Sequence, residues 1–286
     1  MQIITGTTQL LGVIGDPVQH SRSPLMHNAA IAQLGVDFVY LPLPVKANDL
    51  ATALLGFVAI GLRGFNITIP HKQAILPFLQ EISPVAAAIG AVNTVWRTAD
   101  GWAGTNTDAV GFIAPLRELE RDWSTVPVLI LGCGGAARAV VAGCAELGCP
   151  KIAVAGRDPA KLAAFAASWQ DSPWSPTLQI IPWSDLATVL PATQLLVNAT
   201  PLGMAPQVEQ SPLTVTALQK LPTSAIAYDL IYTPRPTQFL KLAQQQGFVT
   251  IDGSEMLVQQ GAAALQIWLD QAVPVAVMRA ALLTGT

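Results

Sequence analysis

The chain has 286 residues, which at roughly 150 residues per domain indicates about two domains. Only 12% of its residues are charged and 51% are hydrophobic, which excludes an intrinsically disordered chain. A net charge of −3 and a pI of about 5.5 argue against a nucleic-acid-binding protein. The longest uncharged run, 186–208, is interrupted by prolines and cannot be a membrane-spanning helix, despite the mean hydropathy of +0.46. We therefore expect a soluble, cytoplasmic protein that binds neither nucleic acid nor membrane.

The cysteines and histidines show no spacing typical of a metal site or a disulfide framework. They are Cys133, Cys144, Cys149, His20, His27 and His71. We expect buried free thiols in a reducing compartment and no bound metal.

Short apolar runs alternate with amphipathic segments through the first 116 residues. The pattern predicts strands at 10–15, 37–45, 64–69, 92–97 and 102–105, and helices at 23–34, 50–62 and 84–89. The helix at 23–34 has the clearest ends, with Pro24 in its first turn and Gly35 just beyond it. The last two strands read as a hairpin that turns at Asp100-Gly101. Alternating strands and helices predict an α/β fold with a mostly parallel sheet covered on both faces.

A charged stretch at 117–126, followed by Pro127, is typical of a link between domains. Beyond it, the pattern predicts strands at 128–131, 151–155, 195–198, 225–230 and 249–251. A helix is predicted at 136–147, and a long apolar helix at 254–270.

A glycine-rich loop lies between the predicted strand 128–131 and the helix that follows. Its residues, Gly132-x-Gly134-x-x-Ala137, match the G-x-G-x-x-A pattern of dinucleotide-binding folds. The first glycine permits a tight turn, the second lets a pyrophosphate approach the backbone, and the helix N-terminus offers free N–H groups. The alternative is a purely structural turn.

The next strand, 151–155, ends in Gly156-Arg157 instead of the acidic residue that usually binds the ribose of NAD. A guanidinium suits the 2′-phosphate of NADP, and Lys161 lies one turn later. The alternative is that Arg157 is an ordinary solvated cation. We favour NADP over NAD.

Polar motifs in the first domain follow or flank predicted strands, where α/β folds bind ligands. They supply hydroxyls, amides, an ammonium and a carboxylate: Ser21, Ser23, Asn66, Thr68, Lys72, Asn93 and Asp108. The predicted hairpin would bring Asn93 and Asp108 back towards each other. Each residue also has a plain alternative: Ser23 as a helix cap, Lys72 as a surface charge, Asp108 as a turn or cap residue.

The sequence closely resembles the shikimate dehydrogenases over nearly its whole length, from Gly12 to about Trp268. The motifs that carry the resemblance are Gly15-x-Pro17-x-x-His20-Ser21-x-Ser23-Pro24-x-x-His27-Asn28, Asn66-x-Thr68-x-Pro70-x-Lys72, Gly90-Ala91-Val92-Asn93-Thr94, Gly104-x-Asn106-Thr107-Asp108, Gly132-x-Gly134-Gly135-Ala136, Asn198-Ala199-Thr200-Pro201-x-Gly203-Met204, Tyr228-Asp229-x-x-Tyr232 and Met256-Leu257-Val258-x-Gln260.

The resemblance implies reversible reduction of 3-dehydroshikimate to shikimate with NADPH, a step of chorismate and aromatic amino acid biosynthesis. It implies a substrate domain at 1–116, a Rossmann-like NADP domain at 117–252, and C-terminal helices at 253–286 that return to the substrate domain. It makes Lys72 and Asp108 the catalytic pair. The implied substrate ligands are Ser21, Ser23, Thr68, Asn93, Tyr232 and Gln260. The implied cofactor site comprises Gly132, Cys133, Gly134, Gly135, Ala136, Gly156, Arg157, Lys161, Leu230 and Gly253.

Three positions depart from the family pattern. Gly156 stands where many members have Asn, Lys161 where Arg is common, and Cys133 where Ala is usual. These changes put one ribose hydrogen bond and one bidentate contact to the 2′-phosphate in question.

In the expected chemistry, an ammonium about 3 Å from the substrate ketone stabilises the developing negative charge and can supply a proton. Lys72 fits that position, and Asp108 would hold it in place. Two roles stay open for Lys72: proton donor, or electrostatic anchor. The alternative functions are a quinate/shikimate dehydrogenase that can use NAD, a methylene-tetrahydrofolate dehydrogenase of the same fold, and a non-catalytic NADPH-binding sensor. The oligomeric state is open between a monomer and a homodimer.

Overall fold

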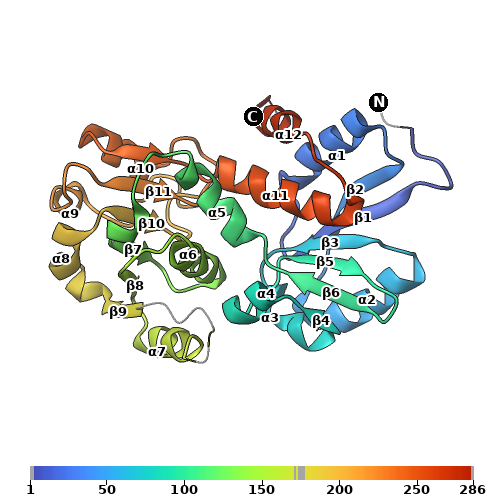
Figure 1. The fold of residues 1–286 in the computed structure, drawn as a ribbon, viewed down its shortest axis with the longest axis horizontal. Helices are drawn as coiled ribbons and strands as arrows, with labels where there is room; N and C mark the ends of the chain where they lie inside the picture. Colours follow the sequence, from blue (N-terminus) through green and yellow to red (C-terminus); the bar gives the residue numbers. More distant parts are fainter. Residues whose placement is uncertain (1–2, 171, 173–177, 285–286) are drawn as a thin grey trace. The chain divides into compact units, whose positions relative to one another are not determined.

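The computed structural model describes residues 3–170, 172 and 178–284 (Figure 1). The chain divides into two compact units, Met1–Gly111 with Leu257–Thr286, and Phe112–Met256. The divisions fall within the helices α5 (Asp108–Arg117) and α11 (Ser254–Leu269). The domain bounds expected from the sequence stay predictions.

The first unit is built on a mixed sheet with the strand order β2-β1-β3-β5-β6-β4. Its strands are β1 (Gln9–Gly15), β2 (Phe38–Pro44), β3 (Gly64–Ile67), β4 (Glu81–Ile82), β5 (Thr94–Arg97) and β6 (Trp102–Thr105). The pairs β1–β2, β1–β3 and β4–β6 are parallel, whereas β3–β5 and β5–β6 are antiparallel. The hairpin β5–β6 turns at the predicted place, where Thr98 N–H donates to the Gly101 carbonyl at 2.9 Å.

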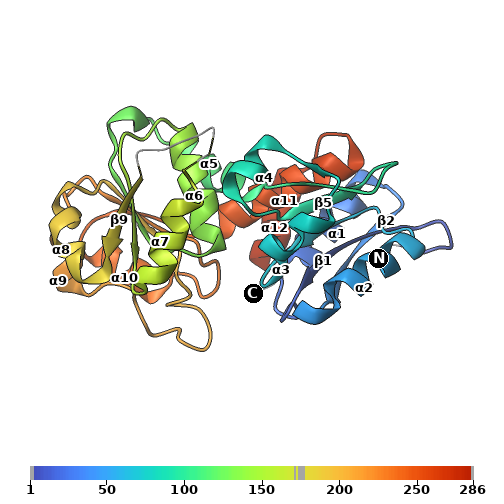
Figure 2. The ribbon, with the colours of Figure 1, turned by 90° about the horizontal axis from the view of Figure 1, so that it is seen from below.

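Helices cover both faces of this sheet (Figures 1 and 2). They are α1 (Ser23–Leu34), α2 (Leu50–Ala59), α3 (His71–Ala74), α4 (Pro84–Ile89), α11 and α12 (Val275–Thr284), with 3₁₀ turns at Ala47–Asp49 and Leu76–Phe78. Side chains of a strand alternate between faces, so Leu11 and Val13 pack with α1, α11 and α12, whereas Ile14 packs with α2. The helix at 23–34 has the predicted bounds, and Gly35 ends it in the left-handed conformation (φ +66°).

The second unit contains a parallel sheet with the order β12-β11-β10-β7-β8-β9. Its strands are β7 (Val128–Leu131), β8 (Ile152–Gly156), β9 (Leu178–Pro182), β10 (Leu195–Asn198), β11 (Ile226–Asp229) and β12 (Val249–Ile251). Its helices, besides part of α5, are α6 (Gly135–Glu146), α7 (Pro159–Ala167), α8 (Leu186–Val189), α9 (Val215–Leu218) and α10 (Gln238–Gln245), with 3₁₀ turns at Trp123–Thr125, Trp183–Asp185 and Leu190–Ala192. The central strands are buried on both faces, which explains their continuous apolar runs.

The expectation of an α/β fold with mostly parallel strands is confirmed in both units. No helix in the described ranges is long and apolar enough to cross a bilayer. In the first unit, most predicted site residues follow β1, β3 or β6 along the chain, whereas Asn93 precedes β5 and Gln260 lies in α11. In the second unit, the predicted site residues lie at the end of, or follow, β7, β8, β11 or β12.

Candidate active site

Lys72 and Asp108 form an ion pair in the first unit. The Lys72 ammonium donates to Asp108 Oδ2 at 2.5 Å, and the two side chains are 23% and 10% exposed. Lys72 lies on the short helix α3, and Asp108 is the first residue of α5, where a negative charge interacts favourably with the helix dipole. Because both side chains are mostly buried, solvent screens their attraction less than that of a surface pair.

Asn93 holds the second oxygen of the Asp108 carboxylate. Its side-chain amide donates to Asp108 Oδ1 at 2.7 Å, so the two residues meet as the predicted hairpin suggested. The side-chain oxygen of Asn93, Oδ1, accepts from the Thr107 backbone N–H at 2.8 Å and from the Thr94 hydroxyl at 2.9 Å. Gln260, on α11, lies beside the same amide, with its Oε1 3.4 Å from Asn93 Nδ2. The structure thus joins four predicted site residues: Lys72, Asp108, Asn93 and Gln260.

Ser21 and Ser23 lie between β1 and the first turn of α1. The Ser23 backbone N–H donates to Ser21 Oγ at 3.3 Å. Ser23 is buried. Thr68, just beyond β3, packs so closely on Gly15 that a Cβ at Gly15 would lie 2.3 Å from Thr68 Cγ2. The close packing of Thr68 on position 15 therefore requires glycine there.

The glycine loop in the second unit fits a dinucleotide pyrophosphate. Gly132 has a φ of +103°, and a Cβ there would lie 3.0 Å from the Ala199 carbonyl oxygen, so the turn requires glycine. Gly134 and Gly135, at the start of α6, have open space where side chains would stand. The α6 N-cap, Gly134, has no side-chain cap, so its first N–H groups are free for an anion.

Arg157 lies just beyond β8, as predicted, is exposed and makes no ion pair with another described residue. Asp158 caps α7 by accepting from the N–H groups of Ala160 and Lys161, and its other oxygen lies 4.0 Å from the Lys161 ammonium. Asp158 is therefore occupied as a helix cap, which leaves the Arg157 cation available to a phosphate.

Two of the departures from the family pattern contact each other. A Cβ at Gly156 would lie 2.9 Å from Leu162 Cδ2 and 3.3 Å from the Cys133 thiol. The thiol at 133 therefore occupies space next to Gly156, so a larger side chain at 156 would require a smaller residue at 133.

The segment after β11 carries Leu230 and Tyr232. A Cβ at Gly253 would lie 2.1 Å from the Leu230 carbonyl oxygen, and the Gly253 N–H donates to the Ile231 carbonyl at 3.1 Å. Leu230 and Gly253 are thus in contact. Tyr232, predicted as a substrate ligand, lies in this second unit together with the predicted cofactor residues.

A buried carboxylate anchors this segment. Asp229 accepts from the Asn198 amide (3.1 Å), the Ile231 N–H (3.1 Å) and the Thr237 hydroxyl (2.6 Å). Burial raises its pKa to about 6. Sequence reasoning quoted Asp229 only as part of a motif and assigned it no role.

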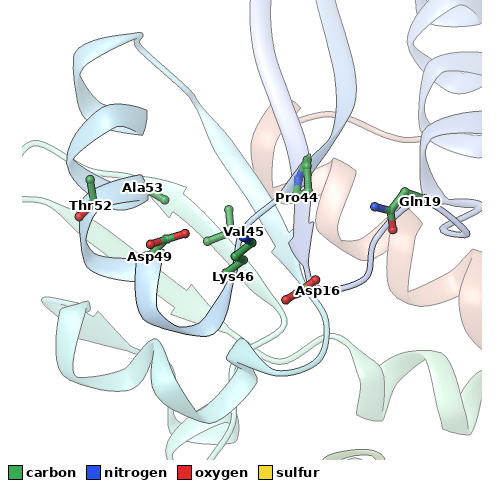
Figure 3. A pocket seen from close by; sticks show the side chains of 8 residues that line it. All are labelled: Asp16, Gln19, Pro44, Val45, Lys46, Asp49, Thr52 and Ala53. Atoms are coloured by element: carbon green, nitrogen blue, oxygen red, sulfur yellow. The ribbon is translucent and has the colours of Figure 1, made fainter.

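The first unit also contains a surface pocket of about 510 Å³ between the ends of β1 and β2 and the helix α2 (Figure 3). Its lining residues are Asp16, Gln19, Pro44, Val45, Lys46, Asp49, Thr52 and Ala53. No predicted site residue lines it, and we assign it no part in the chemistry. Within the described residues, no group of three or more His, Cys, Asp or Glu side chains could hold a metal ion.

Sequence reasoning missed a set of buried polar residues behind the ion pair. The Tyr40 hydroxyl donates to Asn66, whose amide donates to the Thr94 hydroxyl, and the Thr107 hydroxyl accepts from the Asn93 amide. Asn66 was noted in a motif but not assigned to the site. Asn66 carried a signal, because it precedes Thr68 in a polar motif. Tyr40 carried none, since an aromatic residue in an apolar strand reads as ordinary core.

Comparison with known proteins places the chain in a family. A model of the shikimate dehydrogenase substrate-binding domain matches residues 13–95, and one of the shikimate 5′-dehydrogenase C-terminal domain matches 253–283. A shikimate dehydrogenase (NADP(+)) from Synechocystis is 58% identical over 99% of this chain and 98% of its own length. The chain belongs to the shikimate dehydrogenase family.

Solved structures of shikimate dehydrogenases share the whole fold. One in complex with NADP+ is 35% identical, covers 99% of this chain and 97% of its own, and has a TM-score of 0.90. Another, from Thermus thermophilus in complex with NADP(H) and shikimate, is 33% identical, covers 98% of this chain and 100% of its own, and has a TM-score of 0.85. The family's substrate-binding match contains Lys72 and Asn93, and its C-terminal match contains Gln260.

Proposed function

We propose that this chain is an NADP-dependent shikimate dehydrogenase whose catalytic pair is Lys72 and Asp108. It reduces 3-dehydroshikimate reversibly to shikimate. The observation that supports this assignment is the ion pair itself. The Lys72 ammonium and the Asn93 amide donate to different oxygens of one buried carboxylate, which fixes the position of the Lys72 nitrogen.

Lys72 acts on the ketone oxygen. When bound, NADPH would supply a hydride to the ring carbonyl carbon, which leaves negative charge on the oxygen of that carbonyl. An ammonium held in a largely buried site stabilises this charge more strongly than it would in water, and it carries the proton that the new hydroxyl needs. Asp108 fixes the ammonium and, with both oxygens already accepting hydrogen bonds, has no proton of its own to give.

The remaining predicted ligands recognise the substrate's polar groups. Ser21 and Ser23 supply hydroxyls near the start of α1 for the substrate carboxylate. Thr68, Asn93 and Gln260 supply a hydroxyl and amides for the ring hydroxyls. A site built from such hydrogen bonds rejects analogues that lack a hydroxyl more strongly than an apolar pocket would.

The second unit carries the residues that would hold the cofactor. The free N–H groups at the start of α6 would bind the pyrophosphate, and Arg157 with Lys161 would bind the 2′-phosphate. Leu230 and Gly253, which are in contact, would stand at the nicotinamide end. Tyr232 is a proposed ligand of the substrate.

The test is the absorbance at 340 nm of the purified protein with shikimate and NADP+. Quinate and NAD+ in all pairings serve as controls. We expect a fast rise with shikimate and NADP+ alone. A comparable rise with quinate or NAD+ would assign the chain to the dual-specificity enzymes. No rise in any pairing, from folded protein that binds NADPH, would replace the proposal with the non-catalytic sensor.

A cytoplasmic location stays a prediction from the sequence, and the oligomeric state stays open between a monomer and a homodimer. Light scattering coupled to size-exclusion chromatography measures the oligomeric state directly.

A further inference from the structure

A buried hydrogen-bonded chain runs behind the ion pair in the first unit. It begins at Tyr40, in β2, whose ring is fully buried and stacks on His27 with ring centroids 4.0 Å apart. The Tyr40 hydroxyl donates to Asn66 Oδ1 at 2.7 Å. That bond uses the only proton of the phenol, so the direction of this first link is fixed.

From Asn66 the chain continues to the catalytic carboxylate. The Asn66 amide donates to the Thr94 hydroxyl and to the Asn93 backbone carbonyl, both at 3.1 Å. The Thr94 hydroxyl donates to Asn93 Oδ1 at 2.9 Å, which turns the Asn93 amide towards Asp108. Each side-chain acceptor in the chain is thus oriented by a hydrogen bond from the preceding side chain.

We propose that Tyr40 is a positioning residue of the reaction, whose hydroxyl orients the Lys72–Asp108 pair through Asn66 and Asn93. Tyr40 itself touches neither substrate nor cofactor in this assignment. Burial raises the pKa of Tyr40 well above its ordinary value, so the phenol stays neutral and keeps its proton for Asn66. The proposal deepens, and rests on, the proposed shikimate dehydrogenase function.

The geometry explains why a hydroxyl is needed here. Without it, Asn66 Oδ1 would be a buried acceptor without its donor. An unsatisfied buried polar group costs enough free energy to favour other side-chain orientations. We expect those reorientations to misplace the Asn93 amide and, through it, the ion pair.

The experiment compares Tyr40→Phe with Tyr228→Phe. Tyr228 is also fully buried and stacks on Phe112, but its hydroxyl hydrogen-bonds to none of the described residues. Both variants lose one buried hydroxyl, and only the first loses hydrogen bonds. We expect Tyr40→Phe to lower kcat about tenfold, with the KM for NADP+ within twofold of wild type. Tyr228→Phe should leave both parameters within twofold.

A double-mutant cycle separates positioning from a general loss of structure. If Tyr40 acts on kcat through the Thr94 hydroxyl, adding Tyr40→Phe to Thr94→Val should lower kcat by less than twofold further. Thr94→Val breaks the same chain nearer the carboxylate and should lower kcat even if Tyr40→Phe does not fold.

The outcomes are distinct. A wild-type protein inactive with every substrate pair refutes the proposed function, and the positioning role falls with it. An active wild type whose Tyr40→Phe variant matches Tyr228→Phe refutes the positioning role alone. So does a Tyr40→Phe variant whose KM for NADP+ rises as its kcat falls, or a cycle in which the two effects multiply. If Tyr40→Phe does not fold, wild-type kcat in Thr94→Val refutes the role.

Discussion

The Asp108 carboxylate has its two oxygens divided between two donors. Lys72 bonds one oxygen and Asn93 the other, so neither donor can move without leaving an acceptor unsatisfied. A lysine side chain alone is flexible, with four rotatable carbons, and would lose much of its value as a catalytic group. Here the buried Asp108 carboxylate holds the Lys72 side chain in one orientation.

Replacing Lys72 tests whether this nitrogen acts on the reacting oxygen. We expect Lys72→Ala to lower kcat at least about 100-fold with little change in the KM for shikimate, since a positioned acid acts mainly in the transition state. Steady-state kinetics at 340 nm measure both parameters. Lys46→Ala, which removes an exposed lysine of the surface pocket, is the matched control and should keep wild-type kcat. Near-normal turnover in Lys72→Ala would remove Lys72 from the catalytic pair.

Arg157 tests the choice of cofactor. A guanidinium that binds the 2′-phosphate contributes nothing to NADH, which lacks that group. We therefore expect Arg157→Ala to raise the KM for NADPH at least about tenfold and to leave that for NADH nearly unchanged. Arg63→Ala removes an exposed arginine of the first unit and serves as the control. Equal effects on both cofactors would mean that Arg157 does not contact the 2′-phosphate.

At the scale of elements, α11 is fixed to the first sheet by one tryptophan. The Trp268 indole N–H donates to the Val95 carbonyl of β5 at 2.9 Å, and the ring lies directly over Gly64 of β3. A Cβ at Gly64 would lie 2.2 Å from Trp268 Nε1 and 2.7 Å from the Val95 carbonyl oxygen. Because α11 also carries Gln260, this contact helps to place an amide of the proposed site.

Gly64→Ala should therefore destabilise the protein. We expect a loss of about 1–3 kcal/mol in the free energy of unfolding, the usual cost of overpacking. Urea denaturation followed by tryptophan fluorescence measures it. Gly56, inside α2, has open space around its Cβ position, so Gly56→Ala should be neutral or stabilise by up to about 1 kcal/mol. Similar stabilities for the two variants would show that the Trp268 contact does not depend on glycine.

At the scale of the whole molecule, each unit contains a buried group whose ionisation links stability to pH. Burial lowers the pKa of His27, in the first unit, from 6.5 to about 4. Burial raises the pKa of Asp229, in the second unit, from 3.8 to about 6. The two groups act in opposite directions over nearly the same pH range, because one buried charge would be positive and the other is negative.

His27 should destabilise the protein in acid. Below about pH 6.5 the unfolded chain takes up a proton that native His27 does not, so stability falls as the pH drops from about 6.5 to about 4. His27→Asn removes the titration and leaves a cavity cost that does not depend on pH. We expect thermal melts of the variant and wild type to converge towards pH 4. Parallel curves across this range would contradict the linkage.

Asp229 should show the opposite trend. Native Asp229 takes up a proton below about pH 6, before the unfolded chain does, so its unfavourable contribution disappears as the pH drops from about 6 to about 4. Asp229→Asn keeps an oxygen for the Asn198 and Ile231 donors and does not titrate. We expect wild type to gain stability relative to this variant as the pH falls. A constant difference between the two melting temperatures would rule this out.

The local features of this protein could be read from the sequence because their signals are local. The helix at 23–34 was bounded by Pro24 and Gly35, and the loop at 132–137 begins with Gly132, whose φ of +103° other residues rarely adopt. The hairpin turn placed Asn93 near Asp108, and the structure confirms that contact at 2.7 Å. Backbone dihedral preferences and short-range hydrophobic periodicity determine such features, and both depend on only a few neighbouring residues.

Other features depended on residues far apart in the chain. Helix α3, which carries Lys72, has four residues, too few for a hydrophobic periodicity to indicate a helix. Gln260 reaches Asn93 across 167 residues of sequence, and Trp268 reaches Val95 across 173. The hydrogen bond from Tyr40 to Asn66 depends on both side chains facing α1 and α11 from different strands. The sequence determined the motifs and the fold class, whereas the tertiary structure decided which buried polar groups meet, because burial and packing depend on every element at once.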